Sequence, residues 1–217
     1  ENKKFFYENY NCDLKKLAVI KFLPFLCLLK KQSFLKKQLV KFENYLLYPA
    51  QYWEHKNHKF LIDFFDEYKF DNSINKIMLV CTGHDKGCLN KLQNIIKVKN
   101  LNNIKLLGFV SDEELISLYN NAMGVIFPSL IGSHSFPLYE AFYFQKPVFY
   151  NEKILSNELK KYVYLIDVSS KKSLYKKILN FLEDDKKKNQ ITLNAKKKFD
   201  EIFDEKKIID NLKYLIT

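Results

Sequence analysis

Residues 124–142 contain a predicted helix start and, one turn later, a glutamate. An apolar run leads into a short polar loop and then to Pro137, which suits the first helical position because the amide that proline lacks would have no partner there. The free amides of that first turn, with the positive end of the helix dipole, attract an anion. Glu140 follows one turn later, where it can accept a hydrogen bond from a hydroxyl beside that anion. A phosphate beside a sugar hydroxyl indicates a nucleotide, so we interpret this stretch as a nucleotide-sugar site.

The segments that must position this stretch alternate between apolar runs and amphipathic helices. Runs without a polar face are typical of strands in a parallel sheet covered on both sides. Six strands are expected, at residues 45–48, 77–81, 104–107, 124–127, 147–150 and 162–166. Helices are expected at about 57–70, 87–98, from 111, from 137, and at 170–182, 186–202 and 205–216; Ser111 and Glu114 give one start a capping-box signal.

This alternation predicts an α/β fold with a doubly wound, parallel, six-stranded Rossmann-like sheet at residues 45–190, followed by extra C-terminal helices at 191–217. Such sheets bind ligands at the carboxyl ends of their strands. The loops at that edge are expected at 50–56, 82–86, 108–111 and 129–136. In one of them Gly83 follows a strand end, where a small residue lets a ligand approach the backbone closely.

The charge of the chain limits the class of partner. The formal net charge is +11, and all 36 cationic residues are Lys, because the sequence contains no Arg. Arg reads bases and phosphates in a bidentate manner, so its absence argues against sequence-specific nucleic-acid binding. The lysines fit either a solvated surface or attraction to an anionic membrane surface. The most apolar run, at residues 17–29, is too short to span a bilayer.

Cysteine and histidine spacing indicates no metal site. None of the four cysteines form a CxxC pair, and no carboxylate completes a metal motif around the four histidines. We therefore expect free thiols in a reducing cytoplasm and no metal. The sequence shows no secretory signal and does not begin with Met, so we expect it to be part of a longer protein.

Three blocks of the sequence resemble the retaining glycosyltransferases called group 1, or glycosyltransferase family 4. They are YPAQYWEHKNH at 48–58, LGFVSDEEL at 107–115, and FPS at 127–129 followed by PLYEA at 137–141 and QKPV at 145–148. The resemblance covers roughly residues 45–170. It implies the two-domain GT-B architecture, in which this chain supplies the carboxyl-terminal, donor-binding domain. Residues 1–44 would then be the end of the acceptor-side domain or an interdomain segment.

The resemblance also implies roles for single residues. Glu140 matches the glutamate that hydrogen-bonds the nucleotide ribose, and Lys56 matches the lysine that meets the donor diphosphate. Each also has a plainer explanation, because Glu140 can simply favour the helix dipole and Lys56 can be a surface lysine. The remaining implied contacts are to the phosphates, through Ser135, Phe136 and Leu138, and to the base, through the main chain of Val110.

The sequence departs from the family pattern at two of these positions. Gln51 stands where the family usually has an arginine, so it can donate a hydrogen bond but adds no charge. Gly132 stands where the first glutamate of the family's pair would fall. His134 is the nearest polar substitute, and we expect it to contact the transferred sugar as a second catalytic residue beside Lys56.

The resemblance predicts a hexosyl- or glycosyltransferase that uses a nucleotide sugar and a saccharide or lipid-linked acceptor, without a metal or another cofactor. We expect it in the cytoplasm, with peripheral contact to the inner membrane surface left open. Two alternatives also remain open: a non-catalytic partner with a vestigial nucleotide site, and a generic Rossmann-type nucleotide binder. The lack of a GxGxxG turn argues against a dinucleotide dehydrogenase.

Overall fold

The computed structural model describes residues 7–10, 13, 24, 42–132, 136–204, 206, 208, 209 and 213. The chain forms two compact units, one comprising residues 24–197 and the other comprising residues 1–23 with 198–217. The sequence also predicts a strand within residues 17–20 and a helix at 28–42. The strand, nearly all of that helix, and much of the helix expected at 205–216 lie outside the described residues. The domain limits 1–44, 45–190 and 191–217 stay predictions.

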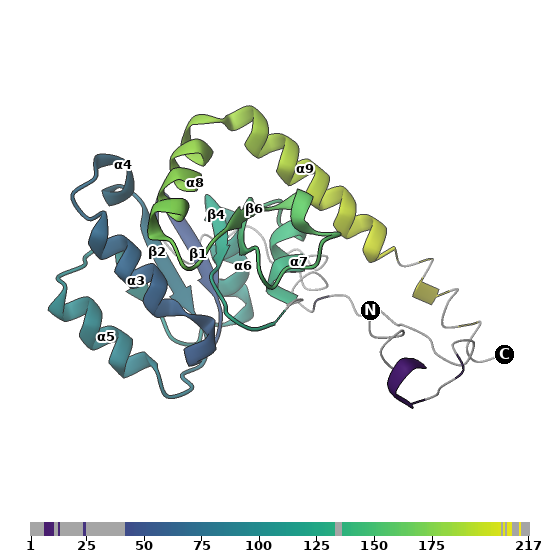
Figure 1. Ribbon diagram of the computed structural model, residues 1–217, viewed down its shortest axis with the longest axis horizontal. Coiled ribbons are helices and arrows are strands. Elements are labelled where there is room, and N and C mark those ends of the chain that lie inside the picture. The colour runs from purple at the N-terminus through teal and green to yellow at the C-terminus, as the bar shows by residue number, and fades with distance from the viewer. Residues whose placement is uncertain are drawn as a thin grey trace. The chain divides into compact units, whose positions relative to one another are not determined.

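One six-stranded sheet forms the centre of the larger unit (Figure 1). Its strands are β1 (Tyr45–Pro49), β2 (Met78–Thr82), β3 (Ile104–Leu106), β4 (Gly124–Phe127), β5 (Val148–Asn151) and β6 (Tyr164–Ile166). All neighbours pair in parallel, in the order β3-β2-β1-β4-β5-β6. The six predicted strands and the doubly wound, Rossmann-like α/β fold are therefore confirmed.

The burial of the strands explains their composition. Every residue of β1, β4 and β5 is buried, so these strands have no solvent-facing side on which polar residues would be favoured. The helices that flank the sheet are α3 (His58–Glu67), α4 (Asn72–Asn75), α5 (Leu89–Val98), α6 (Asp112–Asn121), α7 (Phe136–Tyr143), α8 (Lys171–Glu183) and α9 (Asp185–Ile202). The chain also has the short 3-10 turns η3 (Glu54–Lys56) and η4 (Lys160–Tyr162), and residues 7–10 of the smaller unit are helical.

Two elements differ from the expected boundaries for local reasons. The helix expected at 57–70 ends at residue 67, and a separate α4 follows, because the Asp71 side chain accepts hydrogen bonds from the amides of Ser73 and Ile74 and so begins a new turn. Helix α7 begins at Phe136, so Pro137 occupies its first turn rather than its first position.

The predicted capping box at the start of α6 is confirmed. The Ser111 hydroxyl accepts a hydrogen bond from the Glu114 amide at 3.2 Å, and the Glu114 carboxylate accepts one from the Ser111 amide at 2.8 Å. These bonds satisfy two amide donors that would otherwise be unpaired at the helix start. They fix where α6 begins after β3, and α6 carries Tyr119, which belongs to the site below.

Candidate functional site

The strand order leaves a crevice between the loops that follow β1 and β4. These strands are neighbours, but the chain leads from β1 toward β2 and from β4 toward β5, so the two loops diverge. Doubly wound sheets bind ligands at such a point. A pocket of about 520 Å³ lies here, lined by Pro49, Ala50, Gln51, Trp53, His55, Lys56, Phe127, Ser129, Gly132, Pro137 and Tyr150.

Hydrogen bonds tie the two loops together beneath the pocket. The buried Tyr48 hydroxyl donates to the Lys56 carbonyl at 2.5 Å and lies 3.1 Å from the hydroxyl of Ser129. The amide of Leu130 donates to the carbonyl of His55 at 2.8 Å. Because β1 and β4 are themselves paired, these bonds make the pocket floor continuous with the sheet.

Lys56 brings an ammonium group to this lining. It ends η3, and Asn57 follows with a φ of 58°, which turns the chain into α3. Burial lowers the pKa of the half-buried Lys56 ammonium, because the charge is partly removed from water. An anion in the pocket would stabilise that charge, so the position suits a phosphate.

Glu140 lies one turn into α7, beneath the turn that lines the pocket. Its side chain is nearly enclosed, at 8% exposure. The hydroxyl of the fully buried Tyr119 lies 3.0 Å from Glu140 Oε2 and 3.2 Å from the carbonyl oxygen of Pro137. The Tyr119 ring is stacked on Phe144, with ring centroids 5.0 Å apart. Tyr119 therefore links the Glu140 carboxyl group to the wall of the pocket.

The surroundings of Glu140 disfavour its charge. Burial raises the pKa of the Glu140 carboxyl group to about 7; the hydrogen bond from Tyr119 opposes this rise and the charge of Asp112 adds to it. Near neutral pH the group therefore changes between an acid and a carboxylate. Hydroxyl groups that donate hydrogen bonds to it would favour the carboxylate.

A comparison with models of protein families identifies the family of the chain. The model of "Glycosyl transferases group 1" matches residues 30–198, which is most of the chain. The chain belongs to the group 1 glycosyl transferases. The resemblance found in the sequence is thereby confirmed at the level of this family. A search of curated proteins finds no match.

Solved structures share the fold of this group 1 chain. Anabaena HepE in complex with UDP gives a TM-score of 0.73 at 17% identity, over 99% of this chain and 60% of that one. A glycosyltransferase from Rickettsia africae gives 0.74 at 18% identity, over 99% and 60%. Sucrose-phosphate synthase from Thermosynechococcus elongatus gives 0.69 at 15% identity, over 100% and 56%. This chain thus spans about three fifths of the length of these proteins.

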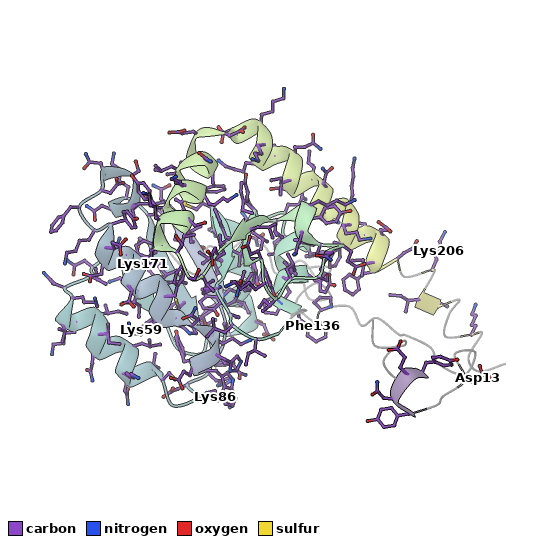
Figure 2. All side chains as sticks on the ribbon, viewed as in Figure 1. Asp13, Lys59, Lys86, Phe136, Lys171 and Lys206 are labelled. Carbon is purple, nitrogen blue, oxygen red and sulfur yellow. The ribbon has the colours of Figure 1, made fainter. Side chains whose placement is uncertain are left out.

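The predicted phosphate-binding residues of the group 1 chain gather only in part. Gln51 and Lys56 both line the pocket. Phe136, labelled in Figure 2, begins α7 and is exposed, whereas the side chain of Leu138 is fully buried, which leaves its backbone amide as the group that a ligand could meet. Ser135 and His134 lie outside the described residues, so their contacts stay predictions.

Gly83 and Val110 do not line the pocket, and their contacts with a nucleotide stay predictions. A side chain at Gly83 would place its Cβ 2.4 Å from the carbonyl oxygen of Ala50. The backbone of the loop after β1 therefore requires a glycine there, whether or not a ligand approaches. Val110 is half-buried in the loop after β3, two residues beyond Gly108, whose carbonyl accepts a hydrogen bond from the Gly83 amide at 2.8 Å.

Sequence reasoning missed three residues that shape the site. Tyr48 and Tyr119 look like core aromatics in the sequence, and only the fold shows that their hydroxyl groups hold Lys56 and Glu140 in place. Trp53 lines the pocket and is the single tryptophan of the chain, which was a signal that could have been used.

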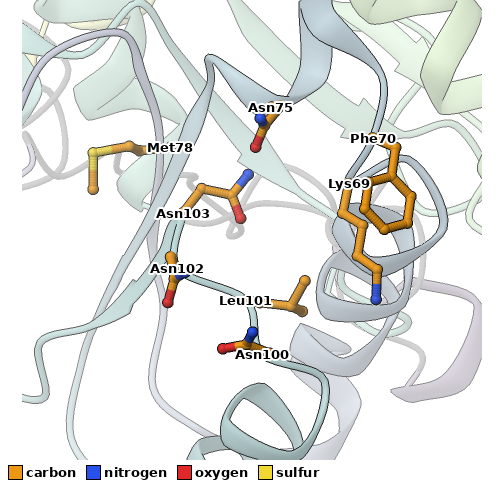
Figure 3. A pocket seen from close by; sticks show the side chains of 8 residues that line it. All are labelled: Lys69, Phe70, Asn75, Met78, Asn100, Leu101, Asn102 and Asn103. Atoms are coloured by element: carbon orange, nitrogen blue, oxygen red, sulfur yellow. The ribbon is translucent and has the colours of Figure 1, made fainter.

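A second pocket, of about 370 Å³, opens at the opposite edge of the sheet (Figure 3). It is lined by Lys69, Phe70, Asn75, Met78, Asn100, Leu101, Asn102 and Asn103, which precede or begin β2 and β3. It thus lies at the amino ends of the strands, away from the switch point.

Two further findings concern only the part of the chain that the structure describes. Within residues 42–132 and 136–204 and the few described positions outside them, no three His, Cys, Asp or Glu residues come together as possible metal ligands. In the same described residues, no helix combines the length and the apolar character needed to cross a membrane.

Proposed function

We propose that this chain is the donor-binding part of a retaining glycosyltransferase, which moves a hexosyl group from a nucleotide-diphosphate sugar to an acceptor. The pocket at the switch point carries this proposal. It brings the Lys56 ammonium group from the loop after β1 and the first turn of α7 after β4 to one space. A cation and the amides of a helix start both favour an anion, and a phosphate group can bond both at once.

We propose one orientation for the donor. Its diphosphate would lie in the pocket beside Lys56 and the first amides of α7. Its ribose and base would extend beyond the residues that line the pocket, the ribose toward Glu140 and the base toward Val110. The family membership and the UDP and UDP-glucose complexes of Anabaena HepE support a nucleotide-sugar donor.

The chemistry that we propose is departure of the diphosphate from the sugar. Negative charge grows on the leaving phosphate oxygen as its bond to the anomeric carbon breaks. The acceptor hydroxyl oxygen forms the new bond to the anomeric carbon, and its proton passes to the departing phosphate. The Lys56 ammonium group and the amides of α7 stabilise that charge from fixed positions. These groups supply the stabilisation that a metal ion provides in other transferases, so no metal is assigned a part, and His134 is assigned the contact to the transferred sugar.

We propose that the acceptor is bound mainly by a region outside this chain, since the chain spans only about three fifths of the length of the similar structures. The proposed acceptor is a saccharide or a lipid-linked molecule, and the transfer takes place at the cytoplasmic side of a membrane. The charge of +11, all of it from lysine, supports peripheral contact with anionic lipid.

A thermal-shift panel of UDP, GDP, ADP and their sugars tests the proposal. We expect saturable stabilisation by one nucleotide sugar, and we expect Glu140→Ala to lose it. The matched control is Glu152→Ala, since Glu152 is exposed and lies just after β5. A panel in which no nucleotide stabilises the chain contradicts the proposal.

A non-catalytic nucleotide-binding partner is the second candidate. It is favoured by Gly132, an exposed position with no carboxylate and no atom within 4 Å of where a Cβ would lie, and by the uncharged Gln51. One measurement on the full-length protein with a bound donor distinguishes the two candidates. A transferase hydrolyses or transfers the sugar, whereas a non-catalytic partner releases the donor unchanged.

A further inference from the structure

Gln51 and Trp53 form a pair at the rim of the pocket. The indole Nε1 of Trp53 lies 2.6 Å from the Gln51 side-chain oxygen Oε1. The backbone amide of Trp53 also donates to the Gln51 carbonyl, at 2.8 Å. Both side chains line the pocket together with Lys56.

The chemistry of the indole decides which way the Gln51 amide faces. A glutamine side chain carries an acceptor oxygen and a donor NH2 group, and a free side chain can present either. An indole N–H can only donate, so it can bond only the oxygen. The contact with Trp53 therefore occupies the oxygen of Gln51 and leaves its two N–H donors for the pocket.

This orientation matters because the pocket suits an anion. A carboxamide oxygen turned toward a phosphate would repel it, whereas an NH2 group would donate to it. We propose that Trp53 is a positioning residue, which holds Gln51 with its NH2 group toward the diphosphate of the donor. This inference rests on the proposed function, because the group that the Gln51 NH2 would bond is the donor diphosphate in the same pocket.

The backbone that carries the pair is fixed from below. Tyr52, between the two residues, is fully buried, and its hydroxyl donates to the Cys81 carbonyl at 3.0 Å. Its amide donates to the carbonyl of His84 at 3.0 Å. The Trp53 ring is thus carried by a backbone segment that is anchored through Tyr52.

A second cation lies on the Trp53 ring. The Lys86 ammonium group lies 5.9 Å from the centroid of the indole, a distance at which a cation is attracted to an aromatic face. Lys86 is not among the residues that line the pocket, so this contact acts on the indole and helps to hold the Trp53 ring in place.

The test combines Trp53→Phe, which keeps an aromatic ring but removes the N–H donor, with Gln51→Ala in a double-mutant cycle. The assay is titration calorimetry with UDP, repeated with GDP and ADP, and with UMP as the control that lacks the second phosphate. Each single variant should weaken UDP binding by roughly three- to tenfold, and the double variant should bind about as well as Gln51→Ala alone. Affinity for UMP should change by less than about twofold.

Additive losses in the double variant, or unchanged UDP affinity in Trp53→Phe, would overturn the inference while leaving the proposed function intact. If the wild-type chain binds none of the three diphosphates, both fail. A readout without ligand tests the geometry itself. The single tryptophan gives one indole N–H resonance in an NMR spectrum, and Gln51→Ala should move it upfield. An unmoved resonance contradicts the contact.

Discussion

Replacement of Glu140 by glutamine should remove a loss of stability that the wild-type chain shows as the pH rises, while it weakens donor binding. The pKa of the buried Glu140 carboxyl group is raised to about 7 from 4.5, so the folded state holds its proton more tightly than the unfolded state does. The stability that this proton provides is complete below about pH 4.5 and is lost as the pH rises through about 7. Glutamine stays neutral throughout and avoids this loss.

The magnitude follows from the two pKa values. Between about pH 5 and about pH 8.5 the wild-type chain should lose roughly 2–3 kcal/mol relative to Glu140→Gln. For a chain of 217 residues this corresponds to a relative change in melting temperature of about 5–10 °C. The cost of fitting an amide beside Tyr119 is independent of pH. It alters the stability difference between wild type and Glu140→Gln by the same amount at about pH 5 and at about pH 8.5, so it does not affect how that difference changes with pH.

The assay is thermal unfolding of wild type, Glu140→Gln and the control Glu152→Gln across that pH range. The wild type and the control should fall together relative to Glu140→Gln. A difference between wild type and Glu140→Gln that stays constant with pH would refute the buried, titrating carboxyl group. In the same samples, wild-type affinity for the donor should rise as the pH passes about 7, because ribose hydroxyls bond the carboxylate.

Three further predictions concern the pocket, the backbone and the surface. Lys56→Met should weaken UDP binding about tenfold or more in calorimetry, whereas Lys91→Met, at an exposed position of α5, should leave it unchanged; equal losses would contradict the assigned contact. Gly83→Ala should lower the free energy of unfolding by more than about 3 kcal/mol in urea titrations, because its Cβ would clash with Ala50, while Gly108→Ala, which has open space, should cost only about 1 kcal/mol. The chain should bind vesicles with anionic lipid at low salt and release them at high salt; binding that ignores lipid charge would remove the membrane proposal.

Local signals in the sequence were enough to predict the elements of the fold. Strands such as β4 and β5 are apolar throughout, so burial on both faces could be inferred without knowing their neighbours. The capping box of Ser111 and Glu114 is equally local, since its two residues lie within one turn. The order of the strands in the sheet could not be predicted from such local signals. Strand β1 lies between β2 and β4, and the periodicity of a segment does not show which other segments it pairs with.

The site was less predictable because its geometry depends on long-range contacts. The ribose role of Glu140 came from resemblance, but its enclosure depends on Tyr119, which lies on another helix. The contact between Tyr48 and Ser129 likewise joins strand β1 to a loop 81 residues later in the chain. The sequence suggests that Gly83 leaves room for a ligand, whereas the atoms nearest to the position of a Cβ there belong to the backbone of Ala50.

The most direct measurement is a crystal structure of this chain soaked with the nucleotide sugar that stabilises it most. We predict that the diphosphate lies between the Lys56 ammonium group and the first amides of α7, with the ribose hydroxyls on the Glu140 carboxylate. A donor bound elsewhere, such as in the pocket around Phe70 and Asn103, or a Glu140 that still faces only Tyr119 beneath a bound donor, would contradict the proposed site.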